Sequence, residues 1–448
     1  MNYKEHFKKN FSLAYPVMLS QMGQVMVGVA DSVMVGRVGV EPLAAASLSN
    51  SIFGVIMMFG IGVSYAITPL VAQADGAGDH RENAILLKHG LFVNMSVSVV
   101  LFLLLMTATQ VMHLLNQPEE VVALAVPYLT IIACSLLPFM LFQTFRQFCE
   151  GLSLTQPPMY ITLAANLLNI ALNYIFIFGK LGLEPMGLVG AGWATLISRI
   201  LMGLGIVGYV WLAQRFKQHL TGFSLVKIAM GRIKKLLNLG IPAGLQFIFE
   251  VGAFATAAVM AGWLGAEPLA AHQIAINLSS ISYMMATGIS AASTIRIGNQ
   301  MGRKNIPMLI KAGRSSFIMG ASFMAFCGLV FIIGKNVLPA LYIDEQSVVI
   351  IAASLLVIAA FFQISDGLQV VALGTLRGME DVKIPTLITL VAYWVVGLPT
   401  SYLLGFPGQF GIQGIWYGLL IGLSLSAIML LLRFHFLTKE KLSYFSKV

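Results

Sequence analysis

Residues 16–45 read PVMLSQMGQVMVGVADSVMVGRVGVEPLAA, and residues 242–271 read PAGLQFIFEVGAFATAAVMAGWLGAEPLAA. Laid over each other without a gap, the two stretches are identical at 12 of 30 positions, and both end in EPLAA. At the same offset of 226 residues, Thr68 aligns with Thr294. Because this offset is half of the chain, the sequence predicts two halves built on one design.

The composition places both halves in a membrane. Of the 448 residues, 58% are hydrophobic and 10% are charged, whereas soluble domains carry about 25% charged residues. Long continuous apolar runs exclude a transmembrane β-barrel, whose strands are short and alternating. A spanning helix needs about 20 mostly apolar residues. The sequence therefore predicts an all-α integral membrane protein with twelve transmembrane helices, at 11–37, 43–72, 85–111, 121–145, 160–178, 188–213, 236–262, 270–295, 312–334, 348–373, 385–404 and 412–434.

The basic residues predict the orientation of these spans. If both termini are cytoplasmic, 23 of the 27 Lys and Arg residues fall on the inner side, Arg37, Lys180 and Lys335 fall outside, and Arg199 falls within a span. Cytoplasmic loops carry such an excess, so we expect a multi-pass protein of the cell inner (plasma) membrane. Loops facing anionic lipid account for the net charge of +9, and no nucleic-acid partner is expected. The long apolar run after MNYKEHFKKN predicts a first span and not a removed signal peptide.

Six spans per half predict two lobes that enter the membrane from the same side. Parallel repeats of this kind are related by a pseudo-two-fold axis along the membrane normal, and such transporters hold substrate between the halves. We expect an N-terminal six-helix lobe over residues 1–213 and a C-terminal six-helix lobe with a short basic tail over 236–448. Residues 214–235 carry six positive charges and are predicted to form a cytoplasmic, amphipathic linker on the membrane surface.

Three carboxylates lie well inside predicted spans, namely those of Asp31, Glu250 and Asp366. An ionised carboxylate at mid-bilayer costs about 2.5–3.5 kcal/mol on insertion scales. Each must therefore face a polar cavity, bind a cation or stay protonated, and all three options indicate ion handling. A polar contact that only holds helices together is the alternative. Glu250 aligns with Gln24 and Asp31 with Ala257, so the two halves carry their carboxylates at different depths.

Amides and a hydroxyl accompany these carboxylates at helical spacing. Gln363 and Gln369 flank Asp366 at intervals of three residues. Oxygen atoms of amides and hydroxyls can coordinate a hard cation, although hydrogen bonds between packed helices remain the alternative. The first half has a similar polar stripe in Asn166, Asn169 and Asn173, to which Thr195 can add a hydroxyl.

Other chemistry is not indicated. The sequence has no phosphate loop, zinc-ligand spacing or nucleophile elbow, so it is not expected to be an enzyme or an ATP-driven motor. Cys134, Cys149 and Cys327 lack ligand-like spacing and are expected to be packing residues. We expect His272 to be a hydrogen-bonded packing residue, and Arg199 has no partner that the sequence identifies.

The many Met and Phe residues, 24 and 28, are typical of an adaptable apolar cavity wall. With carboxylates nearby, such a wall favours cationic amphiphiles, although membrane spans use both residue types freely.

Several motifs resemble those of a known family: ADSVMVGRVG (30–39), VAQADGAGD (71–79), the repeated EPLAA, LRGMEDVKIP (376–385) and AYWVVGLPTSYLLG (392–405). The chain resembles a multidrug and toxic compound extrusion (MATE) transporter of the NorM-like bacterial branch over essentially its whole length. The resemblance implies twelve helices in two lobes and cation-coupled export of drug-like organic cations by alternating access. We expect no cofactor beyond the transported sodium or proton, no structural metal, and a monomer in membrane lipid.

The resemblance also implies roles for single residues. Glu250 and Asp366 match carboxylates that bind the coupling cation in the C-terminal lobe, and Pro16 matches a first-helix proline associated with bending. Phe362 is a departure, because the family often has a tyrosine there, and its absence removes a hydroxyl. The N-terminal set tied to sodium or proton binding is matched by Asp31, Asn169, Asn173 and Thr195.

Alternative functions remain. A flippase for a lipid or lipid-linked substrate would be expected to line its cavity with several basic residues, whereas the charges within the spans are three carboxylates and one arginine. An intramembrane enzyme would need a catalytic constellation. Carboxylates with Asn and Thr oxygens suit sodium and carboxylates alone suit protons, so the coupling ion stays open.

Overall fold

The protein was analysed as a computed structural model that describes residues 3–115 and 117–445. Over these residues the chain is helical, and no strand is found among them. Twelve helices or pairs of consecutive helices are long and apolar enough to cross a membrane, from Tyr3–Gly36 to Gly411–Ser443. The predicted count of twelve spans in a multi-pass, all-α membrane protein is therefore confirmed.

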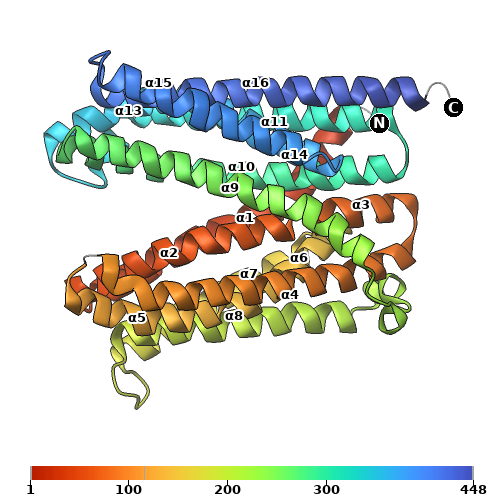
Figure 1. Ribbon diagram of the computed structural model, residues 1–448, viewed down its shortest axis with the longest axis horizontal. Helices are drawn as coiled ribbons and strands as arrows, with labels where there is room; N and C mark the ends of the chain where they lie inside the picture. Colours follow the sequence, from red (N-terminus) through yellow and green to blue (C-terminus); the bar gives the residue numbers. More distant parts are fainter. Residues whose placement is uncertain (1–2, 116, 446–448) are drawn as a thin grey trace. The chain divides into compact units, whose positions relative to one another are not determined.

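The chain packs as two compact units (Figure 1). The first unit is Leu19–Gly244, and the second unit combines Met1–Met18 with Leu245–Val448. Both boundaries fall inside helices, shortly after Pro16 and Pro242, and they are separated by the repeat offset, since 245 − 19 = 226. Packing thus divides the chain at a different place from the 214–235 linker, and the lobes 1–213 and 236–448 stay a prediction.

The first unit is built from the helices of the N-terminal half, with α7 packed against α8, α2 against α5, and α6 against α4 and α8. Its elements are α1 (Tyr3–Gly36, from Leu19 on), α2 (Val40–Ser64), α3 (Ile67–Ala77), α4 (His80–Val111), η1 (Met112–Leu115), α5 (Glu119–Cys134), α6 (Leu136–Gly151), α7 (Gln156–Phe178), α8 (Gly187–Leu212), η2 (Gln214–Leu220) and η3 (Phe223–Leu225).

The second unit has α13 at its centre, packed against α10, α11 and α16, while α15 runs beside α16 (Figure 1). Its elements are α9 (Met230–Trp263, from Leu245 on), α10 (Ala266–Gly302), α11 (Ile306–Gly334), α12 (Val337–Ala340), α13 (Gln346–Gly378), α14 (Lys383–Leu390), the π-helical η4 (Val391–Gly397), α15 (Leu398–Gly405) and α16 (Gly411–Phe445).

Buried polar contacts hold the start of α1 in the second unit. The Arg296 guanidinium donates to the His6 carbonyl at 3.0 Å and to Asn10 Oδ1 at 2.6 Å. The Asn10 amide donates in turn to the hydroxyls of Ser315 and Ser316 at 3.1 and 2.9 Å. A buried charge or amide is tolerated only when it is hydrogen-bonded, so these partners fix the helix start to α10 and α11.

The start of α9 is held in the first unit in a corresponding way. His89 Nε2 on α4 accepts the backbone N–H of Ala229 at 2.9 Å. Arg232 forms an ion pair with Glu82 of the same helix α4. Each unit therefore contains the helix start that the other half of the sequence supplies.

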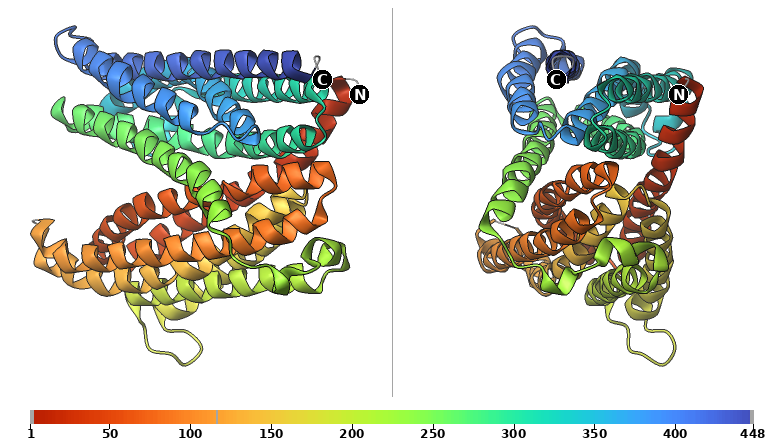
Figure 2. Two further views of the ribbon diagram at one scale, coloured as in Figure 1. Left: turned by 45° about the vertical axis from the view of Figure 1, so that its right-hand side comes forward. Right: turned by 90° about the vertical axis from the view of Figure 1, so that its right-hand side faces the viewer.

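The connection that precedes α9 is docked on α4. Asn83 Nδ2 lies 3.1 Å from His219 Nδ1, and Lys88 donates to the carbonyls of Phe223 and Ser224 at 3.2 Å each. Burial lowers the pKa of His219, so its ring serves as a neutral hydrogen-bonding partner. Figure 2 shows η2 and η3 as a compact group of short turns near the end of α8. The connection ends at Met230, where α9 begins inside the predicted linker, and the surface location of this linker stays a prediction.

The sequence repeat reappears as a pair of equivalent interhelical hydrogen bonds. In the first unit, Thr68 donates to the backbone carbonyl of Gln147 at 3.2 Å. In the second unit, the repeat-related Thr294 donates to the backbone carbonyl of Gly374 at 2.8 Å. Such side-chain bonds to a neighbouring helix backbone, together with small residues, let membrane helices approach closely.

A glycine completes each of these contacts. A Cβ atom at Gly151 would lie 2.7 Å from Val71 Cβ, and one at Gly378 would lie 2.8 Å from Ile297 Cβ. Val71 and Ile297 are again separated by the repeat offset, since 297 − 71 = 226. The prediction that both halves are built on one design is thus confirmed at the level of individual contacts.

Gly378→Leu is expected to destabilise the second unit, because its side chain would have to displace the backbone of α10. Overpacking of this kind costs about 1–3 kcal/mol, which thermal unfolding of the purified protein in detergent would detect as a lower Tm. Gly208→Leu on α8 is the matched control, since a Cβ atom there meets nothing within 4 Å. Equal Tm values for the two variants would contradict the predicted close approach of α13 to α10.

Candidate functional site

A cavity of about 220 Å³ lies within the first unit. It is formed where α1, α7 and α8 face one another, with Met57 of α2 and Phe139 of α6 adding apolar wall. Its polar lining comes from Gln24, Asp31, Asn166, Asn169, Thr195, Ser198 and Arg199.

A chain of hydrogen bonds joins three predicted residues that line this cavity, Asp31, Asn169 and Thr195, through Asn173 on α7. The amide of Asn173 donates to the carboxylate of Asp31 and to Asn169 Oδ1, the latter at 3.0 Å. The amide of Asn169 donates to the Thr195 hydroxyl at 3.5 Å. All four residues predicted from the N-terminal set therefore lie together. Asn173 Oδ1 is buried and has no hydrogen-bond partner among the described residues, and its role as a cation ligand stays a prediction.

The second unit buries the other two carboxylates. Glu250 on α9 and Asp366 on α13 are 5% and 3% exposed, and they lie close enough to repel each other when both are ionised. The Tyr283 hydroxyl donates to the Glu250 carboxylate, which is also attracted by Arg377. The Oε2 atom of Glu250 has no hydrogen-bond partner among the residues that the structure describes. A proton or a metal cation would relieve both the repulsion and the unmet oxygen.

The glutamines that flank Asp366 are also buried, and each accepts a hydrogen bond from a hydroxyl group. Gln363 Oε1 accepts from the Ser282 hydroxyl at 2.9 Å, and Gln369 Oε1 accepts from the Tyr393 hydroxyl at 2.8 Å. Tyr393 also lies near enough to Asp366 to interact with it electrostatically. The predicted stripe on α13 is therefore part of a polar cluster that includes both carboxylates.

Tyr283 and Tyr393 were not identified as site residues from the sequence. Tyr393 stands in the quoted motif AYWVVGLPTSYLLG, but it belongs to η4, a π-helical segment (Val391–Gly397). A π-helical turn changes which side chains face inward and often occurs at functional sites. Helical periodicity therefore does not reveal Tyr393, and the motif was the only available signal.

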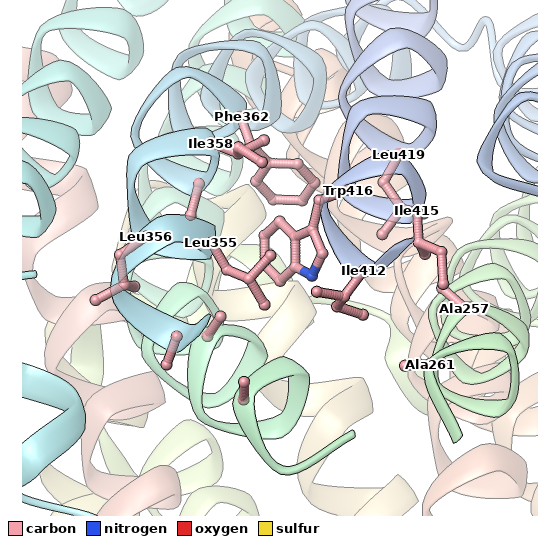
Figure 3. Close-up of a cluster of buried hydrophobic side chains, with 14 of the residues drawn as sticks. Ala257, Ala261, Leu355, Leu356, Ile358, Phe362, Ile412, Ile415, Trp416 and Leu419 are labelled. Carbon is pink, nitrogen blue, oxygen red and sulfur yellow. The ribbon is translucent and has the colours of Figure 1, made fainter. Parts of the chain in front are cut away.

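Phe362 lies beside this cluster in an aromatic wall. Its ring centroid is 6.0 Å from that of Phe254 and 5.8 Å from that of Trp416, and Figure 3 shows Phe362 and Trp416 together among aliphatic side chains of α13 and α16. Phe254 in turn lies 6.0 Å from Tyr393. Trp416 Nε1 donates to His272 Nδ1 at 3.2 Å, which confirms His272 as a hydrogen-bonded packing residue.

Two further predictions concern prolines and cysteines. Pro16 lies inside α1, and its repeat partner Pro242 lies inside α9. Since proline lacks the N–H that an internal helical position requires, both sites can bend, but bending of α1 stays a prediction. Cys134, Cys149 and Cys327 are free thiols.

Comparison with known proteins tests the resemblance seen in the motifs. The sequence profile of the MatE family matches residues 16–175 and 242–403. The two matches begin 226 residues apart (242 − 16 = 226), which is the offset of the internal repeat. The chain belongs to the MatE family. The predicted family assignment is thus confirmed.

Curated relatives of this MatE-family chain match nearly its full length. The multidrug resistance protein NorM of Vibrio vulnificus (strain YJ016) is 35% identical over 442 residues, which cover 98% of this chain and 97% of that protein. The multidrug resistance protein MdtK of Yersinia pseudotuberculosis serotype O:1b (strain IP 31758) is 35% identical over 441 residues, covering 97% and 96%.

Solved structures share the fold. The crystal structure of a MATE protein in the bent conformation matches with a TM-score of 0.90 at 20% identity, covering 99% of each chain. An outward-facing multidrug resistance MATE transporter matches with a TM-score of 0.89 at 21% identity, covering 97% of this chain and 96% of the other.

Proposed function

We propose that this chain exports cationic, amphiphilic drug-like molecules in exchange for sodium ions or protons, by alternating access between two lobes. The observation that carries the proposal is the presence of carboxylates within the spans of both units of a MatE-family protein, with Asp31 in the cavity of the first unit and the buried pair Glu250 and Asp366 in the second. The names of the NorM and MdtK relatives, both multidrug resistance proteins, support the substrate class. The bias of basic residues supports insertion in the inner membrane with both termini cytoplasmic.

The mechanism follows from competition for the carboxylates. With Glu250 and Asp366 ionised, the second unit attracts any cation that can reach it, whether ion or drug. Binding of the entering cation neutralises the cluster and removes that attraction, so drug and ion favour different states. The same reasoning applies to Asp31 in the first unit. The chain acts on its own, with no cofactor other than the transported ion.

Drug efflux from vesicles with separately imposed sodium and pH gradients tests the proposal. Reconstituted protein is expected to move a fluorescent organic cation against its gradient when one of the two gradients is present. No movement under either gradient would reject cation-coupled export. The same assay without protein sets the leak, and it separates transport from passive partition into lipid.

The flippase and enzyme alternatives are less well supported. The cavity of the first unit is lined by one carboxylate and one guanidinium, and not by the several basic residues that a phosphate-bearing lipid would require. The NorM and MdtK relatives, which match most of the chain, are named as multidrug resistance proteins and not as enzymes.

Phe362→Tyr is expected to increase sodium dependence. The new hydroxyl would add an oxygen ligand beside Asp366, and one additional hydrogen-bond-like contact to an ion corresponds to roughly a tenfold gain in affinity. The concentration of sodium for half-maximal export should fall, while the pH response stays largely the same. Phe331→Tyr, in the same hydrophobic cluster on α11, is the control. Unchanged sodium dependence would mean that residue 362 is not near a sodium site.

A further inference from the structure

Arg199 is a half-buried cation within a span, without an acidic partner at ion-pair distance. It lies on α8 and lines the same cavity as Asp31. Its guanidinium carbon sits 5.0 Å from the ring centroids of both Phe53 and Phe139, and Nη1 donates to the Ser135 hydroxyl at 2.8 Å. In the described part of the chain, no carboxylate oxygen lies within 4.0 Å of its nitrogen atoms. Aromatic faces and a neutral hydroxyl therefore hold the charge in place.

The charge of Arg199 is constant, whereas that of Asp31 is not. A guanidinium stays protonated in proteins, and two phenylalanine rings fix this one in position. Asp31 is the group that an entering cation neutralises in the proposed cycle. The two residues interact electrostatically across the cavity, so the state of one determines what the other contributes.

The net charge of the cavity follows from its walls. Besides Asp31 and Arg199, the ionisable group that faces this region among residues 3–115 and 117–445 is Tyr128 of α5, whose hydroxyl donates to Asn50 of α2 at 3.3 Å and is neutral. Helix α7 contributes uncharged amides, and α2 and α6 contribute Met57 and Phe139. The net charge of the cavity is therefore zero while Asp31 is ionised, and it becomes +1 once Asp31 is neutralised.

We propose that Arg199 is the release residue of this cavity, which repels an organic cation as soon as the entering ion has neutralised Asp31. The inference rests on the proposed function and assigns Arg199 a role in specificity. Before neutralisation, the carboxylate offsets the guanidinium and a drug cation is attracted to Asp31. Afterwards the drug shares a small cavity with an uncompensated positive charge. Two unit charges about 7 Å apart at an effective dielectric constant of about 20 weaken binding about 50-fold.

The same charge balance makes an opposite prediction for an anion. With Asp31 neutralised, the guanidinium still has N–H donors beyond the one used by Ser135, and it favours a carboxylate or sulfonate. Phenyltrimethylammonium and benzenesulfonate have similar shapes and opposite charges. They therefore separate an electrostatic effect of Arg199 from an effect on the shape of the cavity.

Binding of these two probes to the full-length protein in nanodiscs, measured by calorimetry, tests the proposal. Asp31→Asn imitates the neutralised state and is expected to weaken phenyltrimethylammonium binding about 50-fold or more and to strengthen benzenesulfonate binding. Adding Arg199→Gln to Asp31→Asn is expected to restore most of the cation affinity and to remove the gain for the anion. Adding Arg199→Lys, which keeps the charge, is expected to restore little.

Three outcomes would overturn the assignment of Arg199. In the first, the double variant with Arg199→Gln binds phenyltrimethylammonium no better than Asp31→Asn alone. In the second, Arg199→Gln and Arg199→Lys change the affinity equally, and in the third, the affinities for the two probes change by the same factor in the same direction. Arg215→Gln, which removes a positive charge outside the cavity, is the control and should change neither affinity. Thermal unfolding of every variant identifies one that has lost its fold, and Arg199→Met then replaces Arg199→Gln.

Transport separates this proposal from the function on which it rests. Arg199→Gln alone is expected to lower both the KM and the maximal rate of drug export, because binding tightens and release slows. If the wild type exports drug under a gradient but Arg199→Gln changes neither the KM nor the maximal rate, the release role is rejected and the proposed antiport is unaffected. Absence of export by the wild type would reject the antiporter itself.

Discussion

Glu250→Gln and Asp366→Asn are each expected to abolish gradient-driven drug export while the protein still inserts and folds. Both carboxylates are buried beside each other in the second unit, where an amide of the same shape cannot take up a proton and lacks the negative charge that attracts a cation. A neutral amide also removes the most expensive charge from the span, so stability should not fall much. We expect export at least about 100-fold below wild type, a loss of about 2.7 kcal/mol of coupling.

Efflux from reconstituted vesicles measures this loss, with Tm as the check on folding. Glu267→Gln, which alters a carboxylate in the first turn of α10 away from the buried pair, is the matched control and should export normally. If Glu250→Gln or Asp366→Asn kept near wild-type export with normal ion dependence, that residue would not bind the coupling ion.

Membrane potential alone is expected to drive drug accumulation if two cations enter for each monovalent drug that leaves. Exchange of one cation for one drug moves no net charge, whereas a two-for-one exchange moves one charge. That charge is worth about 2.3 kcal/mol per 100 mV, or about 50-fold in concentration ratio. The carboxylates of Asp31 in the first unit and of Glu250 with Asp366 in the second are the two places where we propose that the cations bind.

Inside-out vesicles held interior-positive, without a chemical gradient of sodium or protons, measure this component. Asp31→Asn is expected to weaken it, because one of the two cation sites is lost. Asp344→Asn, which changes an acidic residue outside the spans, serves as the control. Accumulation that follows only the pH or sodium gradient and ignores potential would reject the two-cation scheme and leave one-for-one antiport.

The spans and the internal repeat could be predicted because both depend on local sequence. A helix that crosses lipid must satisfy its own backbone, so apolar length alone reveals it, and the repeat is visible as identities such as EPLAA. The composition of the two units could not be predicted in this way. It depends on contacts such as Arg296 with His6 and Asn10, which join residues far apart in the chain and give no periodic signal.

The same distinction applies to the sites. Asp31, Glu250 and Asp366 were predictable because a carboxylate within a span is expensive and so must have a role. Tyr283 and Tyr393 were not, since a tyrosine hydroxyl within a span costs little and gives no such signal. Arg199 was recognised as unusual from its cost, but its support by two phenylalanine rings required the folded chain.

The exchange of helix starts bears on how such a chain arose. Asn10 of the N-terminal half is bonded to α11, and Arg232 of the C-terminal half is paired with α4. A six-helix ancestor with this arrangement would have lacked part of its own packing as a monomer. Two copies could have completed each other by swapping identical segments, a low-cost route to a dimer. Fusion of the two genes would make such a swap intramolecular, and each half would then depend on the other even after the two sequences had diverged.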